Sequence, residues 1–222
     1  MSICFIKRRP LPKEFDKTGV INIFEASADK IDSVNKLWIN QGTGNNMSLS
    51  SSNCTLVDDN GIASVNFPEG IYGRVKLSET PITIYGIFRG LTTGSNWSGL
   101  ICKELTSNQS SSNYDIFVNA TNDCVGLKNI TTTIKINDPD YHVYCLSNGK
   151  AYADGVYLGN AGTYTNAYFN QYMRINQIWR NGWTSGNINV NYRFIAFGTV
   201  EHSEEQIINN CEYLTEKYIV GD

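Results

Sequence analysis

The sequence has 222 residues, of which 41% are hydrophobic and 18% are charged, and its formal net charge is −3. This balance provides enough apolar surface for a folded core and too little charge for a disordered chain. The slight excess of acidic residues argues against a protein that binds nucleic acid or an anionic membrane surface, since both require a basic face.

The first twenty residues predict an extended N-terminal arm. They begin with MSICFIKRRPLPK, in which two prolines follow a basic run, and proline disfavours helical backbone in the residue before it. The apolar run is short and the charges follow it, so we expect no secretory signal peptide. No later stretch reaches 18 apolar residues, so no membrane-spanning helix is expected either. Residues 1–20 are therefore predicted to be an arm, either loose or docked onto a larger assembly, and residues 21–222 one domain.

Short apolar runs, each bounded by turn-forming residues, predict β-strands along most of the domain. Asp59-Asn60-Gly61 is a strong turn signal between two such runs, and Asn148-Gly149 and Asp154-Gly155 mark two further hairpins. Strands spaced this closely favour an antiparallel sandwich or barrel over a parallel α/β sheet. The segments expected to form strands or hairpins are 20–26, 37–40, 54–67, 71–77, 82–89, 100–105, 114–120, 124–130, 132–137, 141–162, 173–179 and 189–200.

One segment near the C-terminus predicts a helix over residues 204–218. Ser203 and Gln206 have the spacing of a capping box, in which each side chain bonds the backbone amide of the other residue. Apolar residues then recur every three or four positions, so one face of the helix should pack on the sandwich. This stripe consists of Ile207, Cys211, Leu214 and Tyr218.

Several of these segments, taken in order, resemble concanavalin A-like (laminin-G-like) domains. The resemblance covers roughly residues 30–218. It implies an all-β fold: a two-sheet antiparallel sandwich (jelly roll) with one short C-terminal α-helix, in which the Asp-Gly turn and the late helix are structural. The matching pieces are the W-x-N segment at Trp38, Gly70–Gly73, the T-I-Y strand at Thr83, the Y-x-D-G hairpin at 152–159, the strand ending in FGTV at 197–200, and Ser203–Ile207.

The chain departs from the enzymes that use this fold. Glycoside hydrolases of the family share a strand motif E-x-D-x-x-E, which places their catalytic carboxylates on one face. Glu14-Phe15-Asp16 begins in this way, but it lies in the arm and lacks the third acid. No nucleophile-elbow motif or glycine-rich phosphate loop is present. We therefore expect a protein that is not an enzyme, and keep a glycosidase on the same fold as an alternative.

No metal site or cofactor is predicted. The six cysteines form no C-x-x-C pair, and neither His142 nor His202 lies at zinc-ligand spacing. Each cysteine is therefore expected to be a free, buried thiol. Calcium-binding members of the family use acidic side chains, which Asp58-Asp59 or the pair Asp138 and Asp140 could supply here. Surface turns use aspartate for capping more often, so calcium is kept only as an alternative.

Sugar sites on β-sandwiches combine exposed aromatic faces with Asn, Asp or Arg side chains, and loops on rigid sandwiches often carry them. For Trp97 and Trp183, packing and sugar binding both remain open, whereas Trp38 and Trp179 are expected in the core. The candidate glycan-binding residues are Trp183, Trp97, Tyr114, Asp115, Arg180 and Asn181, with Tyr168 and Tyr172 as further aromatic neighbours.

A lectin-like chain without a secretion signal suggests a phage virion protein, which is made in the host cytoplasm and acts outside the cell. The chain is similar to laminin-G-like domains of phage tail, baseplate and capsid-fibre proteins. This resemblance implies a non-enzymatic virion surface protein that binds host cell-surface polysaccharide, with no nucleic-acid or membrane partner. The alternative is a structural decoration or assembly subunit without a sugar site, docked to other virion proteins through residues 1–20 or forming a homo-oligomer.

Overall fold

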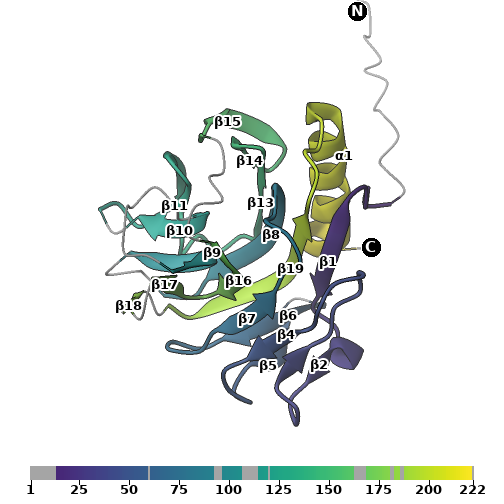
Figure 1. Ribbon diagram of the computed structural model, residues 1–222, viewed down its shortest axis with the longest axis vertical. Helices are drawn as coiled ribbons and strands as arrows, with labels where there is room; N and C mark the ends of the chain where they lie inside the picture. The colour runs from purple at the N-terminus through teal and green to yellow at the C-terminus, as the bar shows by residue number, and fades with distance from the viewer. Residues whose placement is uncertain are drawn as a thin grey trace, which may run out of the picture.

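Two antiparallel β-sheets pack face to face, and a C-terminal helix covers the outer face of one of them (Figure 1). The fold is therefore the predicted all-β sandwich with a single late helix. The computed structural model describes residues 14–59, 61–92, 97–106, 115–119, 121–162, 169–180, 183–185 and 188–221.

The first sheet, sheet A, has eight strands within the described residues. Their order is β15-β14-β13-β8-β19-β6-β5, and β1 also pairs with β19. The central strands β8 and β19 are buried along almost their whole length, because the core lies on one side of them and the helix on the other. The strands are β1 (Val20–Glu25), β5 (Thr55–Asp59), β6 (Ile62–Phe67), β8 (Thr83–Gly90), β13 (His142–Ser147), β14 (Lys150–Ala153), β15 (Val156–Asn160) and β19 (Val190–Gly198).

The second sheet, sheet B, has eleven strands in the described part of the chain. Nine follow the order β12-β11-β10-β9-β16-β7-β4-β3-β2, and the hairpin of β17 and β18 joins this sheet through a parallel pairing of β17 with β9. The strands are β2 (Ile31–Asp32), β3 (Leu37–Trp38), β4 (Met47–Leu49), β7 (Gly73–Lys76), β9 (Ser98–Leu105), β10 (Ile116–Asn119), β11 (Cys124–Leu127), β12 (Ile130–Lys135), β16 (Phe169–Ile175), β17 (Ile178–Arg180) and β18 (Trp183–Ser185); a short 3-10 helix, Ala28–Lys30, precedes β2.

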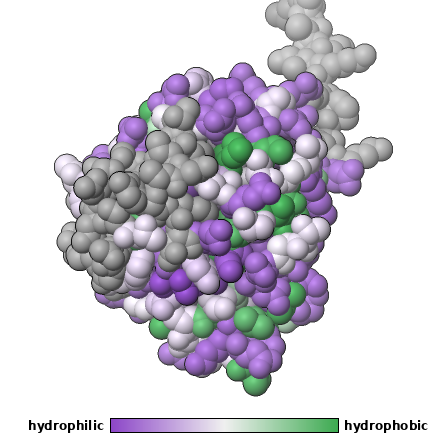
Figure 2. Space-filling model, viewed as in Figure 1, coloured by the Kyte–Doolittle hydropathy of each residue, from purple (hydrophilic) through white to green (hydrophobic). Residues whose placement is uncertain are grey.

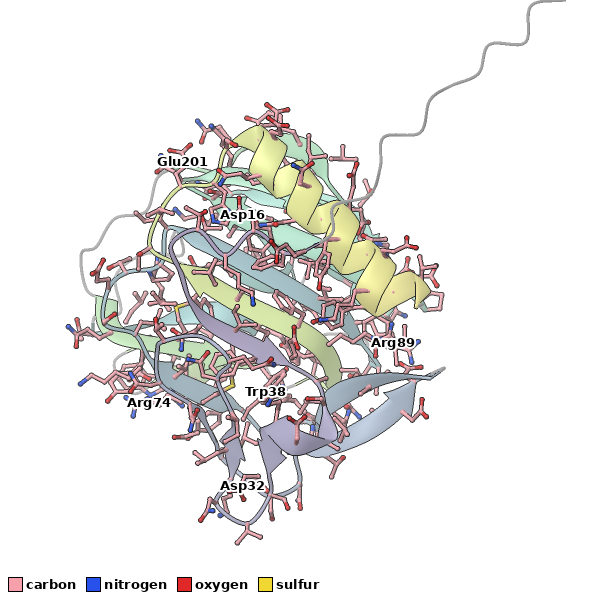
Figure 3. All side chains as sticks on the ribbon, turned by 90° about the vertical axis from the view of Figure 1, so that its right-hand side faces the viewer. Asp16, Asp32, Trp38, Arg74, Arg89 and Glu201 are labelled. Carbon is pink, nitrogen blue, oxygen red and sulfur yellow. The ribbon has the colours of Figure 1, made fainter. Side chains whose placement is uncertain are left out.

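Aromatic residues from both sheets fill the space between them. Trp38, predicted to lie in the core, is 0% exposed, and its ring centroid lies 5.7 Å from that of Phe24 and 6.2 Å from that of Phe67 (labelled in Figure 3). Its indole N–H donates to the backbone oxygen of Glu25 (2.9 Å). Buried indole rings need such a partner, so this bond fixes Trp38 as a structural residue.

The helix α1 (Glu204–Thr215) begins where the capping box predicts. Gln206 N donates to Ser203 Oγ (3.2 Å), and Ser203 N donates to Gln206 Oε1 (2.8 Å). After Thr215 the chain continues as a π-helical segment, Glu216–Val220, and ends at Gly221, whose φ of 80° favours glycine. The helical segment therefore runs beyond its predicted end at residue 218.

The apolar stripe of α1 packs on the outer face of sheet A. Ile207, Cys211 and Leu214 are at most 1% exposed, and they share one buried cluster with Tyr85 of β8 and Phe194 of β19. Each such side chain contributes roughly 2 kcal/mol by leaving water. The stripe thus closes one face of the sandwich. No helix in the described part of the chain is long and apolar enough to cross a membrane.

The end of the predicted arm is part of this packing, while residues 1–13 lie outside the described residues. Phe15 is 5% exposed, and its ring meets those of Tyr85 and Phe194 edge-on, with centroids 5.3 Å apart in both cases. Asp16 accepts a hydrogen bond from Gln206 Nε2 (2.9 Å) and is labelled beside α1 in Figure 3. Residues 15 and 16 are therefore tied to the helix and to sheet A.

Five of the six cysteines lie within the described residues, and all five are buried and unpaired, as predicted. Burial raises the pKa of Cys54, Cys102 and Cys211 to about 12. Because the thiolate is the reactive form, these thiols are inert packing groups at neutral pH. Cys4 lies outside the described residues.

Candidate functional site

The outer face of sheet B is the sandwich face that α1 leaves uncovered. On β7, Gly73 and Val75 are buried while Arg74 is half-buried and Lys76 is exposed, so these two cations project outward. Figure 3 shows Arg74 at the margin of the molecule, on the side away from α1. Side chains that project from this face are therefore in a position to meet a ligand.

Pairing of β7 with β16 brings two short motifs together. Tyr172 lies opposite Lys76, and Arg174 lies opposite Arg74. Tyr72 precedes Arg74 by two residues, as Tyr172 precedes Arg174, so two Tyr-x-Arg motifs face the same side of the sheet in antiparallel order. Each tyrosine consequently lies diagonal to the arginine of the other strand.

The two arginines share one carboxylate. Arg74 donates to both oxygens of Glu104, from Nε and from Nη2, at 2.8 Å each. Arg174 donates from Nε to Oε2 of the same carboxylate (2.7 Å) and from Nη1 to Gln177 Oε1 (3.1 Å). Since such forked, charge-assisted bonds are strong and directional, Glu104 fixes both guanidinium groups in place.

Aromatic rings cover the guanidinium planes. The Cζ atom of Arg74 lies 3.6 Å from the ring centroid of Tyr172, and that of Arg174 lies 4.5 Å from the centroid of Tyr72 and 5.8 Å from that of Trp179. These distances are within the range of cation–π contacts. We call Tyr72, Arg74, Glu104, Tyr172 and Arg174 the Tyr–Arg cluster.

The charged members of the Tyr–Arg cluster differ in burial. The side chains of Glu104 and Arg174 are 2% and 8% exposed, whereas that of Arg74 is 35% exposed. Burial would raise the pKa of Glu104, but the hydrogen bonds from Arg74 and Arg174 outweigh it and lower the pKa. The hydrogen bond to Glu104 raises the pKa of Arg74. These shifts favour the charged forms of Glu104 and Arg74, and Arg74 presents its charge to solvent.

A second aromatic group continues this face toward β10. Trp97, a predicted site residue, is 41% exposed and stacks on Phe117, with centroids 5.4 Å apart and planes inclined by 29°. Phe117 forms a small buried cluster with Cys102 and Ile178, and Cys102 lies opposite Arg174. Trp97 and the Tyr–Arg cluster thus occupy neighbouring parts of one face.

Asp115, also a predicted site residue, is 0% exposed. Its Oδ2 accepts a hydrogen bond from Lys103 N (2.9 Å), and its Oδ1 lies 3.5 Å from Lys103 Nζ. Burial raises the pKa of Asp115 against the effect of the Lys103 ammonium group, and burial lowers the pKa of Lys103. The structure therefore places this carboxylate within the sandwich, away from solvent.

Two other predicted residues, Arg180 and Trp183, lie on the hairpin of β17 and β18. Arg180 and Trp183 face each other as a pair at the end of this hairpin, and the structure describes only their backbone. Tyr114 and Asn181 lie outside the described residues. Trp179, predicted to be core, is partly exposed, because Ile178 takes the buried position on β17.

The sequence reasoning missed most of the Tyr–Arg cluster, although it named Tyr172 as a neighbour of the candidate site. The signal available was the repeated Tyr-x-Arg pattern, once within the predicted strand 71–77 and once at the start of the predicted strand 173–179, where Tyr172 precedes it by one residue. That pattern does not reveal that the two strands pair in register. Glu104 is 30 residues from Arg74 and 70 from Arg174, so no local pattern connects it with them.

The aspartates considered for calcium have other partners. Asp58 Oδ1 accepts from Gly61 N (2.7 Å), Asp138 Oδ1 accepts from Asp140 N (3.0 Å), and Asp59 pairs with Arg89 (2.7 Å). The first two are turn-capping bonds of the ordinary kind. Among the residues that the structure describes, no group of three or more His, Cys, Asp or Glu side chains is arranged to hold a metal ion.

A groove of about 600 Å³ lies between α1 and the start of β13, and His142 is one of its walls. The Nδ1 atom of His142 lies 2.7 Å from Asp154 Oδ2, and its Nε2 atom lies 3.5 Å from Asp138 Oδ1. The hydrogen bond to Asp154 raises the pKa of His142 and outweighs burial. Cys211 also lines the groove, and burial raises the pKa of its thiol to about 12.

The chain was compared with known proteins once this geometry was established. No protein-family model and no curated protein sequence matches it. Among solved structures, it is similar to Trypanosoma rangeli sialidase in complex with 2,3-difluorosialic acid, with a TM-score of 0.63 and 11% identity over 96% of this chain and 36% of that chain.

Two botulinum neurotoxin structures are also similar. One, titled for the dependence of type C toxin entry on two ganglioside molecules, has a TM-score of 0.54 and 12% identity over 90% of this chain and 52% of that chain. The other is the binding domain of toxin DC in complex with rat synaptotagmin II, with a TM-score of 0.54 and 11% identity over 89% and 52%. The chain thus spans about a third of the sialidase and half of the toxin structures. These likenesses define the class as a jelly-roll-like β-sandwich.

Proposed function

We propose that this protein is a non-enzymatic carbohydrate-binding module whose binding face is the outer face of sheet B. The observation that carries the proposal is the Tyr–Arg cluster, in which guanidinium donors and tyrosine rings are fixed by a buried carboxylate on the face that α1 leaves open. Sugar recognition needs such a combination, because apolar ring faces stack on aromatic side chains while hydroxyls need rigid hydrogen-bonding groups.

Trp97 supplies the stacking surface in this proposal. One side of its ring packs on Phe117, and 41% of the residue is exposed. A half-exposed indole that is already held by a neighbour loses little freedom when a ligand stacks on it. Arg74 and Tyr172 then provide polar contacts on the same face. Trp183 of β18 remains a further candidate.

The ligands of the structural neighbours are compatible with this proposal. The sialidase structures include complexes with sialic acid and related sugars, and cell entry of the type C toxin depends on interaction with two ganglioside molecules. At 9–12% identity these neighbours support the fold and leave the ligand to experiment. Placement on a phage virion rests on the laminin-G-like sequence resemblance, and detection of the chain in purified particles by mass spectrometry would test it.

The absence of catalysis is part of the proposal. A glycosidase needs one carboxylic acid to donate a proton and a second carboxylate nearby. Glu104, the acidic residue of the Tyr–Arg cluster, is held ionised by two guanidinium groups and is 2% exposed. It therefore neither donates a proton nor reaches a sugar. Release of reducing sugar from a polysaccharide that the protein binds would contradict this part.

The test is a glycan array that includes host cell-wall and capsular polysaccharides, probed with the full chain with and without calcium. Trp97→Ala, and separately Trp183→Ala, remove candidate stacking rings. Tyr157→Ala is the matched control, since Tyr157 is 50% exposed on β15 at the edge of sheet A. Selective binding that Trp97→Ala loses and Tyr157→Ala keeps is the expected result. A folded chain that binds no glycan would overturn the proposal.

One observation favours the second candidate function, a structural or assembly subunit. β15 is the edge strand of sheet A, and it exposes Val156 (63%) and Tyr157 (50%). Edge strands with exposed apolar side chains are sites where another chain can add a strand. Light scattering of the wild type and of Val156→Asp tests this candidate. A wild-type oligomer that becomes monomeric in Val156→Asp supports it, and a monomer in both proteins contradicts it.

A further inference from the structure

We infer that the outer face of sheet B selects acidic glycans, those that carry carboxylate, sulfate or phosphate groups, over neutral ones. This inference rests on the proposed function and names the class of ligand for the same site. It arises from the sign of the charge on that face, which is opposite to the net charge of the whole chain.

The charge balance of the face is positive. Arg74, Arg174 and Lys76 project from neighbouring strands, while Glu104 contributes the carboxylate that both arginines share. Three cations against one carboxylate leave a local net charge of +2. Hydroxyl groups of neutral sugars can be bound by uncharged donors and acceptors, whereas an excess of fixed cations specifically favours an anionic group.

The residues paired in succession with Arg74 across β4, β3 and β2 include no second carboxylate close to Arg74. Ser48 of β4 lies directly opposite Arg74, then Leu37 of β3, and then Asp32 of β2. Three strand spacings separate Asp32 from Arg74, a distance of about 14 Å. At physiological ionic strength the screening length is about 8 Å, so Asp32 does little to offset the positive charge at Arg74.

The geometry leaves hydrogen-bond donors directed at solvent. Arg74 uses Nε and Nη2 to reach Glu104, and the described residues supply no acceptor for its Nη1. Tyr172 covers one side of the guanidinium plane, which restricts a ligand to the exposed edge. Planar guanidinium edges bind carboxylate, sulfate and phosphate oxygens with paired donors. Lys76, opposite Tyr172, adds a mobile cation two residues away.

The ion pairs of Glu104 with Arg74 and Arg174 could serve only to join β7, β9 and β16. The exposed parts of this face, Lys76 and the outer edge of Arg74, indicate a binding role in addition. Glu104 and Arg174 are buried, and Nε and Nη2 of Arg74 complete their hydrogen bonding. Stability therefore requires neither the remaining, exposed edge of the Arg74 guanidinium group nor Lys76. Lys76 is exposed and bears the same sign of charge as Arg74. Like charges placed side by side repel each other, and a bound anion would relieve that repulsion.

The experiment compares acidic with neutral glycans on the full chain. The probes are polygalacturonate, its fully methyl-esterified form as the neutral match, a sulfated polysaccharide and a glycerol-phosphate teichoic acid, beside a broad array of neutral and acidic sugars. Comparison of the probes that carry carboxylate, sulfate and phosphate groups identifies which anion is preferred. We expect the acidic members to dominate binding, with affinity falling as NaCl rises from about 0.05 to about 0.5 M.

Two variants locate the effect. Arg74→Gln should weaken binding of acidic glycans about tenfold, since it removes a hydrogen bond to a charged group. Lys76→Gln, at an exposed position that leaves folding unaffected, should weaken it roughly threefold. Lys150→Gln is the matched control, because Lys150 is a 45% exposed lysine at the far end of sheet A, and it should leave the affinity unchanged.

The outcomes separate this inference from the proposed function. Equal binding of acidic and neutral glycans, lost in Trp97→Ala, would overturn the inference and leave the proposed function standing. Preference for acidic glycans that Lys76→Gln and Lys150→Gln reduce equally would assign it to net charge and also overturn the inference. A folded chain that binds no glycan of either class would overturn both.

Discussion

Glu104 shows how one residue can organise a surface. Its side chain is 2% exposed, yet it remains charged because Arg74 and Arg174 donate three hydrogen bonds to it. Removing one member of such a buried network leaves the opposite charge without a partner, which costs more than the pair contributes. Because Glu104 and Arg174 are buried, the Tyr–Arg cluster is held in place, and the hydrogen bonds to Glu104 also fix the partly exposed Arg74.

We expect Glu104→Gln to lower the free energy of unfolding by about 3 kcal/mol, since Arg174 would keep its charge in a buried position. Urea denaturation measures this change. Glu201→Gln is the control, because Glu201 pairs with Lys150 at the surface, where ion pairs contribute about 0.5 kcal/mol. Equal losses in the two variants would contradict the assignment of Glu104 as the anchor.

His142 gives a prediction about pH. The hydrogen bond to Asp154 raises its pKa above the ordinary value of 6.5, so the folded state binds this proton more tightly than the unfolded state. The resulting stability is fully present below about pH 6.5 and disappears as pH rises through the higher folded-state pKa. His142→Gln should therefore reduce Tm more at pH 5.5 than at pH 9.

The comparison of wild type with variant at each pH cancels the contribution of the titrating groups that do not contact His142. NMR titration of the His142 ring provides an independent reading of the same pKa. A His142→Gln difference that is equal at the two pH values, or a ring that titrates below 6.5, would show that Asp154 does not stabilise the imidazolium ion.

At the scale of elements, α1 is the part that local sequence determines most fully. The capping box at Ser203 and the stripe from Ile207 to Tyr218 are both present as predicted. We expect Ser203→Ala to cost about 1 kcal/mol, because the amide of Gln206 loses its acceptor. Thermal unfolding measures the loss. Ser33→Ala, in an exposed turn, is the control and should change Tm little; similar losses in both variants would reject the capping role.

Local sequence specifies the pairing of some strands and not of others. Turn residues such as Asn148-Gly149 marked the hairpin of β13 and β14, whose pairing is between neighbours in the chain. The pairing of β7 with β16 joins segments about 100 residues apart, and no local pattern encodes that register. Trp97 could be proposed as exposed because its loop was visible in the sequence. The Tyr–Arg cluster depends on long-range register and therefore emerged only from the structure.

At the scale of the whole molecule, the two sheets have different environments. α1 and residues 15–16 cover the outer face of sheet A, while the outer face of sheet B carries the Tyr–Arg cluster and Trp97. In the view of Figure 2, apolar side chains form small separate areas among polar ones outside the grey region. The proposed binding face combines the polar and aromatic side chains of the Tyr–Arg cluster with Trp97.

The most direct test of this account changes one face at a time and measures glycan binding. A Trp97→Ala, Lys76→Gln double variant alters the outer face of sheet B, and a Tyr157→Ala, Lys150→Gln double variant makes the closest matching change at the edge of sheet A. We predict that the first loses glycan binding and the second retains it, with both folded by circular dichroism. Retained binding in the first variant, or equal loss in both, would contradict the assignment of the binding face to sheet B.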